Sequence, residues 1–209
     1  MNQLPMIENC TAVILAGGES KRMGQDKASL RFGHDSLLNL AIHHMKPLFN
    51  TLVVSVREPR EHLLFPQLCD RGSDHGPIAG IATALERVDT SWVLAIACDM
   101  PFISADMIVS MAAKRDGQDA VVPCADGHLQ PLAAFYSKSC LPAMQAQMHE
   151  GRRSLQALIA KVNASIVSEK ELRTFDSELL SFMDLDTQTD VIRAEQLLAL
   201  RKNKEGNVI

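Results

Sequence analysis

Residues 15–27 read LAGGESKRMGQDK and directly follow the short apolar run CTAVI at residues 10–14. The run is rich in β-branched side chains and has the length of a buried strand, so a strand is expected to end at Leu15. Glycine lets the backbone approach a ligand closely, and successive N–H groups of such a turn can point at an anion. Lys21, Arg22 and Lys27 add positive charge. The stretch therefore predicts a loop that binds a chain of phosphates.

The spacing of the glycines matches neither common nucleotide-binding pattern. Gly17, Gly18 and Gly24 do not form G-x-G-x-x-G, and the loop is not a G-x-x-x-x-G-K-[ST] phosphate loop. A glycine turn that only joins a strand to a helix is the second interpretation, and spacing alone does not decide between the two.

The totals are those of an ordinary soluble globular protein. The chain has 209 residues, of which 46% are hydrophobic and 22% charged, and no change in composition divides it. We therefore expect residues 1–209 to form one domain. The net charge of −4, without a basic run longer than a pair, argues against a general nucleic-acid surface.

The five cysteines and the apolar runs indicate a cytoplasmic setting. No pair of cysteines forms C-x-x-C or has a histidine at zinc-ligand spacing, so reduced thiols are expected. No run approaches the roughly 20 apolar residues that a membrane span needs. The N-terminus shows no signal-peptide pattern.

Strand patterns and helix patterns alternate along the chain. Alternation of this kind predicts an α/β protein, a single Rossmann-like domain with a mostly parallel twisted sheet and helices on both faces. The tail from residue 203 to 209 is polar and expected to fray. Strands are expected at 10–15, 51–56, 92–98, 120–124, 164–167 and 182–185. Helices are expected to begin at Asp35 or Ser36, at Pro59, at Pro77 and after Ser104, and to cover 138–149, 154–162 and Thr187 to about Lys202.

Ligands of such sheets bind beyond the carboxyl ends of the strands, which singles out the loops after Leu15, Cys69 and Cys98. The second loop contains Asp70 and the turn GPIAG at 76–80, whose small residues would admit a flat base. The third places Asp99 at the end of the most apolar strand. A carboxylate there can bind Mg²⁺ together with phosphate oxygens, or it can pair with a lysine.

Together these loops resemble a known family. The motifs L-A-G-G-x-S-x-R-M-G-x-D-K, D…G-P-I-A-G, C-D-M-P and Q-P-L occur here in the order found in the molybdenum cofactor guanylyltransferases, over residues 11–199. The resemblance implies the nucleotide-diphospho-sugar transferase type of fold. It also implies GTP, the molybdopterin (Mo) cofactor and Mg²⁺ as ligands. In that reaction the pterin phosphate attacks the α-phosphorus of GTP and pyrophosphate leaves.

The resemblance also implies roles for individual residues. L-A-G-G with G-P-x-A-G goes with guanine, whereas cytidylyl relatives tend to show L-A-A-G. Matching positions are Arg22, Lys27 and Asp99 for catalysis; Leu15, Ala16, Gly17, Gly18, Lys27, Ser55, Asp70, Gly76, Gly80 and Asp99 for the nucleotide; Asp99 for the metal; and Gln130, Asp184 and Asp186 for the acceptor.

One motif departs from the family. Relatives end with F-x-N-x-N-T-P, whereas residues 182–188 read FMDLDTQ, so Asp184 and Asp186 replace both asparagines. An Asp side chain only accepts hydrogen bonds, whereas Asn also donates them. Our hypothesis is that Asp184 or Asp186 helps Asp99 to hold Mg²⁺; a solvated loop is the alternative.

Other interpretations remain open. The turn GRR at 151–153 could receive a phosphate or an acidic partner surface, or simply be solvated. A cytidylyl pterin or sugar-phosphate transferase, and a nucleotide-binding protein that delivers cofactor without turnover, are the rival functions. The resemblance implies molybdenum-insertion proteins and molybdoenzyme chaperones as partners, with neither nucleic acid nor membrane among them.

Overall fold

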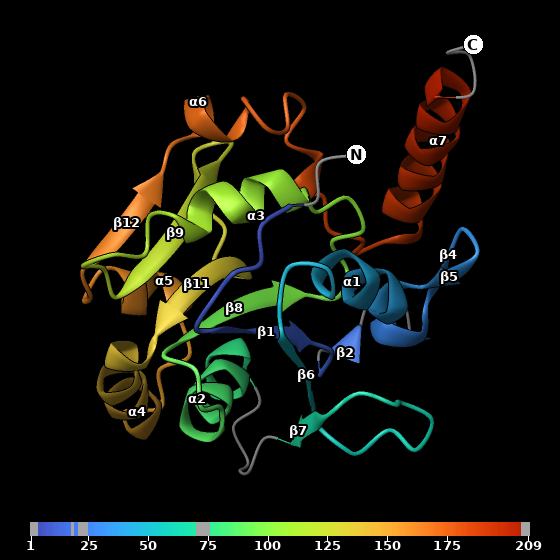
Figure 1. Ribbon diagram of the computed structural model, residues 1–209. Coiled ribbons are helices and arrows are strands. Elements are labelled where there is room, and N and C mark those ends of the chain that lie inside the picture. Colours follow the sequence, from blue (N-terminus) through green and yellow to red (C-terminus); the bar gives the residue numbers. More distant parts are fainter. Residues whose placement is uncertain (1–3, 18, 21–24, 70–75, 206–209) are drawn as a thin grey trace.

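The computed structural model describes residues 4–17, 19–20, 25–69 and 76–205 (Figure 1). Within these ranges one sheet has the strand order β10-β9-β11-β8-β1-β6-β7, and β12 also pairs with β9. The strands are β1 (Cys10–Leu15), β6 (Thr51–Val56), β7 (Gln67–Cys69), β8 (Trp92–Ala97), β9 (Ala120–Ala125), β10 (His128–Leu129), β11 (Ala133–Ser137) and β12 (Ala164–Val167).

The sheet is mostly parallel, as expected. β1 pairs in parallel with β6 on one side and β8 on the other, and β6 pairs in parallel with β7. β11 runs antiparallel to both β8 and β9, which places these two strands in the same direction. The chain leaves β1 for β6 on one side and later returns to β8 on the other, so the order reverses at β1. This switch point is where α/β sheets bind ligands.

Helices cover both faces of the sheet (Figure 1). Side chains alternate along each strand, so Ile14 of β1 packs with α1 (Leu37–Met45) and α3 (Ala105–Ala112). Val13 points to the other face and packs with α2 (Pro77–Arg87), α4 (Leu141–His149) and α5 (Leu155–Ile159). The continuous apolar run of β8 is explained by this double burial.

Several helix starts follow the predicted capping chemistry. The Ser36 hydroxyl accepts a hydrogen bond from the N–H of Asn39 and caps the start of α1. The Ser104 hydroxyl accepts one from the N–H of Met107 and caps the start of α3. Thr187 and Asp190 form a reciprocal capping box at the start of α7 (Gln188–Glu205), since the N–H of each residue donates to the side chain of the other. The helix continues through Glu205, beyond the expected end near Lys202.

The remaining elements are short. Two small hairpins follow the first strand: β2 (Glu19–Ser20) with β3 (Gln25–Asp26), and β4 (Arg31–Phe32) with β5 (Asp35–Ser36). The 3₁₀ turn η1 (Lys27–Ser29) lies between them. The other short elements are η2 (Lys138–Cys140), α6 (Glu169–Leu172) and η3 (Leu180–Phe182).

Two predicted elements were wrong. The helix expected from Pro59 is a series of turns, in which the Gln67 side chain bonds the Arg60 N–H at 2.7 Å and the Arg60 carbonyl at 2.9 Å. These are groups that a helix would pair internally. The strand expected at 182–185 is absent. The N–H of Leu185 donates to the Asp99 carbonyl at 3.1 Å, but β8 is already flanked by β1 and β11 and has no free edge for another strand.

Candidate active site at the carboxyl edge of the sheet

The glycine loop begins where three parallel strands end together. Leu15 lies opposite Ser55 of β6 and Ala97 of β8. The N–H of Ala16 continues this pairing, because it donates to the Ser55 carbonyl at 2.9 Å. Ala16 and Ser55 are both buried, whereas Leu15 and Gly17 are half-buried. The backbone at Leu15–Gly17 is therefore fixed at the edge of the sheet, as the phosphate-loop interpretation requires.

Lys27 joins two carboxylates that are distant in the sequence. Its Nζ donates to Asp99 Oδ2 at 2.6 Å and also to the carboxylate of Asp186. Asp99 follows β8, whereas Asp186 lies just before α7. The Lys27 and Asp99 side chains are 17% and 13% exposed, while that of Asp186 is 42% exposed. The cluster is therefore open to solvent on the Asp186 side, where a charged ligand could enter.

The electrostatics of the cluster are dominated by its carboxylates. Burial lowers the pKa of Lys27, but hydrogen bonds to Asp186 and Asp99 outweigh it, so the pKa is raised and the ammonium persists at neutral pH. Burial, followed by the charges of Asp186 and Asp99, raises the pKa of Asp184. The predicted acidic segment thus lies close to Asp99, and negative charge accumulates around one lysine.

Sequence reasoning missed Arg60, which fixes the two ends of the glycine loop. Its guanidinium donates to Asp26 through Nη1 at 2.6 Å and Nη2 at 2.9 Å, and Nη2 also donates to the Ala16 carbonyl at 3.1 Å. The hydrogen bond from Arg60 is the main cause that lowers the pKa of Asp26. Since Asp26 directly precedes Lys27, Arg60 holds the lysine backbone in register with the end of β1.

The predicted turn at 76–80 opens α2 at the same edge. Gly76 is the N-cap and has no side chain to cap the helix, and Pro77 occupies the first turn, as expected. A Cβ on Gly76 would lie 3.6 Å from Arg153 Cβ, so the turn at 151–153 packs beside the α2 N-terminus. Gly80 is buried inside α2. The turn predicted to admit a base and the turn predicted to receive an anion are therefore neighbours.

Gln130 lies on the opposite side of the β8 end from the glycine loop. The half-buried Gln130 follows β10, and its N–H donates to the Pro123 carbonyl at 2.8 Å. Two residues later, the Leu132 carbonyl accepts from the N–H of Ala97 at 2.9 Å. The Q-P-L segment thus runs alongside the last residue of β8, two positions before Asp99. Of the remaining predicted site residues, Gly18, Arg22 and Asp70 lie outside the described part of the chain.

The carboxylates suit Mg²⁺ as an incomplete site. Within the described ranges no group of three or more His, Cys, Asp or Glu side chains forms a metal cage. Mg²⁺ does not need one, because it commonly binds one or two carboxylates and completes its shell with water and substrate phosphates. Asp99 and Asp186 already converge on one cation, the Lys27 ammonium. The residues present therefore fit a metal held jointly with a phosphate ligand.

The cysteines take no part in this site. All five are free thiols, as expected. Burial raises the pKa of Cys98 to about 12 although it directly precedes Asp99, so its thiol stays protonated and unreactive. None of the helices in the described residues is long and apolar enough to span a membrane.

The chain is an α/β protein of the Rossmann-like type, with basic and acidic groups gathered at the switch point of the sheet. The chain belongs to the family of MobA-like NTP transferase domains, whose model matches residues 12–166. It is accordingly a nucleotidyltransferase.

Curated relatives cover most of the chain. A protein of Pelotomaculum thermopropionicum named "Probable molybdenum cofactor guanylyltransferase" is 34% identical over 88% of this chain and 91% of its own length. A protein of Desulfosudis oleivorans named "Molybdenum cofactor guanylyltransferase" is 30% identical over 88% of this chain and 94% of its own.

Solved structures agree with the fold. The structure of molybdopterin-guanine dinucleotide biosynthesis protein A from Archaeoglobus fulgidus superposes with a TM-score of 0.81 at 25% identity, over 90% of this chain and 98% of that one. The 2-C-methyl-D-erythritol 4-phosphate cytidylyltransferase of Thermus thermophilus shares the fold, with a TM-score of 0.64 at 19% identity, over 90% and 98% of the two chains. The expected nucleotide-diphospho-sugar transferase type of fold is confirmed.

Proposed function

We propose that this protein transfers GMP from GTP to the terminal phosphate of the molybdopterin (Mo) cofactor, in a reaction that depends on Mg²⁺. The observation that carries the proposal is the Lys27 ammonium bound to Asp99 and Asp186 at the carboxyl end of β8. The names of the curated relatives support the choice of base and acceptor.

The reaction needs positioning and charge neutralisation more than covalent work by the protein. An oxygen of the pterin phosphate attacks the α-phosphorus of GTP. The bond from that phosphorus to the bridging oxygen of the β-phosphate breaks, and pyrophosphate carries away the electron pair. Lys27 and Arg22 would balance the charge of the triphosphate and of the leaving pyrophosphate.

Mg²⁺ would be held by Asp99, with Asp186 or Asp184 as a second carboxylate. When bound, it would supply positive charge that offsets the negative charge of the reacting phosphates. Lys27 would then exchange its contacts with the carboxylates for contacts with phosphate oxygens. Its raised pKa keeps it cationic for that exchange.

The nucleotide would lie against the backbone of Leu15–Gly18 and beside Ser55. The guanine base would face Asp70 and the turn from Gly76 to Gly80, whose small residues leave room for a planar ring. The acceptor would approach from Gln130 and the acidic segment at Asp184 and Asp186. This arrangement places donor and acceptor on opposite sides of Asp99.

The wider setting is part of the same proposal. Residues 1–209 would act as one cytoplasmic domain, with its substrates supplied and its product taken up by molybdenum-insertion proteins and molybdoenzyme chaperones. Neither nucleic acid nor a membrane is required for the proposed reaction.

The test is pyrophosphate release from each nucleoside triphosphate with purified pterin cofactor and Mg²⁺. We expect release with GTP, and a loss on the order of 10²-fold or more in Lys27→Ala and in Asp99→Ala, since each removes one charge-stabilising group. Lys114→Ala is the matched control, because Lys114 pairs with Glu171 of α6 at 2.9 Å and lies outside the Lys27 cluster. Near-normal rates in either site variant would remove that residue from the mechanism.

Two outcomes would favour the rival functions. Preference for CTP, or for a sugar phosphate as acceptor, would overturn the assignment of base or acceptor while keeping the enzyme class. Binding of GTP without any pyrophosphate release, in the presence of active cofactor and Mg²⁺, would instead indicate a protein that delivers cofactor.

A further inference from the structure

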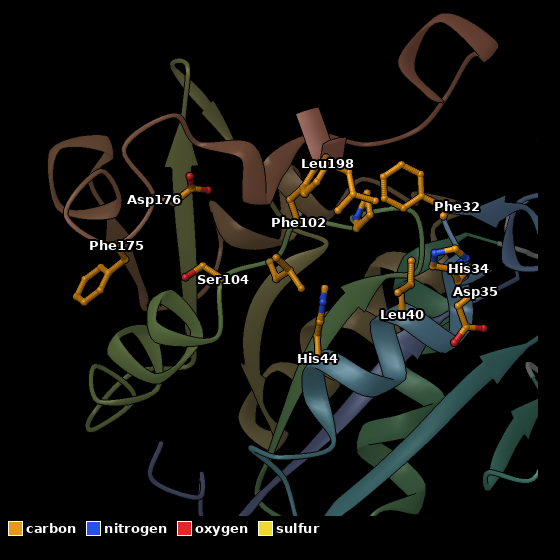
Figure 2. Close-up of a pocket in the computed structure, with 13 residues that line it drawn as sticks. Phe32, His34, Asp35, Leu40, His44, Phe102, Ser104, Phe175, Asp176 and Leu198 are labelled. Carbon is orange, nitrogen blue, oxygen red and sulfur yellow. The ribbon is translucent and has the colours of Figure 1, made fainter. Parts of the chain in front are cut away.

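A cavity of about 540 Å³ is built from side chains other than those of the Lys27 cluster (Figure 2). Its walls come from the β4–β5 hairpin, α1, the loop that follows Met100, residues 175–176, and α7. Cavities of this size commonly hold small organic ligands. Lys27, Asp99 and Asp186 are not among its lining residues, so the proposed reaction does not account for it.

Most of the cavity wall is apolar and partly aromatic. Phe32 of the hairpin and Phe102 of the loop meet edge to face, with ring centroids 5.8 Å apart, and Leu198 of α7 closes the same side (Figure 2). Leu40 of α1 faces them from across the cavity. Flat rings and branched side chains of this kind favour a compact aromatic ligand.

His44 of α1 lines the cavity (Figure 2). Its Nδ1 is fully buried and unpaired among the described residues, so the ring contacts the cavity through its other atoms. Burial, and then the neighbouring His43, lowers the pKa of His44, so the ring is neutral at pH 7. The His44 ring therefore adds no positive charge to the wall.

The acidic side chains that line the cavity are Asp35 and Asp176, while the Arg31 guanidinium lies at the outside of the hairpin, on the His34 carbonyl at 3.3 Å. Asp176 lies at one end and Asp35 at the other (Figure 2), and no Lys or Arg is among the described lining residues. Hydrogen bonds from the Asn39 amide and the Ser36 N–H lower the pKa of Asp35, so it remains a carboxylate at neutral pH. A nucleotide or a phosphorylated pterin would be repelled here, whereas a cation would be attracted.

We propose that this cavity binds a small aromatic compound that carries an alkylammonium group. The ring would lie between Phe32, Phe102 and Leu198, with the neutral His44 ring as part of the wall. The positive charge would face the carboxylate of Asp35 or that of Asp176. The volume favours a free small molecule over a peptide, which would need an extended groove.

The test uses three indoles of equal ring size and different charge: tryptamine, 3-methylindole and indole-3-acetate. Binding to the full chain is followed by calorimetry and by NMR of the His44 ring, with and without saturating GTP. We expect tryptamine to bind at least roughly tenfold more tightly than indole-3-acetate, with 3-methylindole between them, and to perturb the His44 signals. GTP should not displace tryptamine.

The double variant Asp35→Asn/Asp176→Asn should weaken tryptamine roughly tenfold, because it removes both carboxylates that line the cavity. Asp89→Asn, at an exposed position after α2, is the matched control and should bind normally. Equal binding of the cationic and anionic indoles, no binding at all, or an unperturbed His44 ring in the wild-type protein would each overturn the proposal. These readouts do not depend on the folding of the variant.

Two further outcomes decide where the ligand lies and what it is. Displacement of tryptamine by GTP would place it in the nucleotide site and overturn the assignment to this cavity. Tighter binding of a short amidated peptide containing Trp-Lys would show that a protein side chain is the true occupant, which would overturn the small-molecule assignment. Pyrophosphate release from GTP is measured separately, so failure of this proposal leaves the proposed reaction untouched.

Discussion

The guanidinium of Arg60 binds the carboxylate of Asp26 through both terminal nitrogens, at 2.6 and 2.9 Å, and one of these nitrogens also donates to the Ala16 carbonyl at 3.1 Å. Ala16 lies at the start of the glycine loop and Asp26 near its end. The Arg60 backbone is itself held by the Gln67 side chain of β7. The planar guanidinium of Arg60 thus sets the position of Lys27 relative to β1. A lysine at position 60 could not make these three hydrogen bonds with the same geometry.

Arg60→Lys should therefore impair catalysis with little effect on folding. Small displacements of a positioned group cost large factors in rate, and we expect a loss of roughly tenfold or more in kcat/KM for GTP. The pair is partly exposed, so the melting temperature should change little. Steady-state pyrophosphate release and thermal melting, measured side by side, separate the two effects.

Arg173→Lys provides the control for this prediction. Arg173 binds Glu169 through Nε at 2.9 Å, a comparable arginine–carboxylate pair on α6 and outside the site. It should leave kcat/KM unchanged. Wild-type kinetics in Arg60→Lys, or an equal loss in both variants, would show that Arg60 does not position the loop.

The acidic segment should set the requirement for Mg²⁺. Asp186→Asn removes one of the two carboxylates that converge on Lys27, so more Mg²⁺ should be needed for half-maximal rate. The expected increase is roughly tenfold or more, as for the loss of a group that supports a metal ligand. Titrating Mg²⁺ at saturating GTP in Asp186→Asn and Asp184→Asn measures this. An unchanged requirement in both variants would refute the hypothesis that this segment helps to hold the metal.

Local patterns predicted most of the fold because they report on local burial. The apolar run at 92–98 was expected to be a central strand, and β8 lies between β1 and β11 as that run requires. The pairing of Lys27 with Asp99, 72 residues apart, follows the rule that ligand sites form at carboxyl ends of parallel strands. It was one of the two alternatives that the sequence left open for Asp99.

Contacts that depend on loop geometry could not be predicted in this way. Arg60 lies in a mixed segment without periodicity and finds Asp26 34 residues away, so nothing local marks it. Phe182–Leu185 has the composition of a strand, but tertiary context overrides propensity, since the end of β8 offers no free edge there. His44 fits the helical pattern of α1, and only the structure shows that it lines a cavity.

The residue at position 17 should govern the choice of base. The resemblance associates L-A-G-G with guanine and L-A-A-G with cytosine. A Cβ at Gly17 would lie 3.4 Å from Arg57 Cγ and 3.6 Å from its backbone nitrogen, which is ordinary contact, so Gly17→Ala should fold normally. We expect its ratio of kcat/KM for GTP over CTP to fall at least roughly tenfold, as one methyl group can discriminate by about this factor.

Gly117→Ala is the control for Gly17→Ala. Gly117 has a φ of +67° in a turn before β9, so alanine there should lower the melting temperature without altering the GTP/CTP ratio. If Gly17→Ala keeps the wild-type ratio, the first glycine does not select the base.

His44 should make stability fall in mild acid. Burial, followed by the charge of His43, lowers its pKa in the folded state below the ordinary value of 6.5. Between the lowered pKa and 6.5 the unfolded chain binds more protons than the folded chain. The free energy of unfolding therefore rises with pH through this window, and the contribution of the neutral His44 ring to stability disappears as the pH falls through it. His44→Leu removes this titration, and its free energy of unfolding should decrease less than that of wild type between pH 7.5 and 5.5.

Urea unfolding at both pH values measures the difference, with His149→Leu controlling for the loss of an exposed imidazole. An equal decrease in the free energy of unfolding in wild type and His44→Leu would show that the pKa of His44 is not lowered in the folded state.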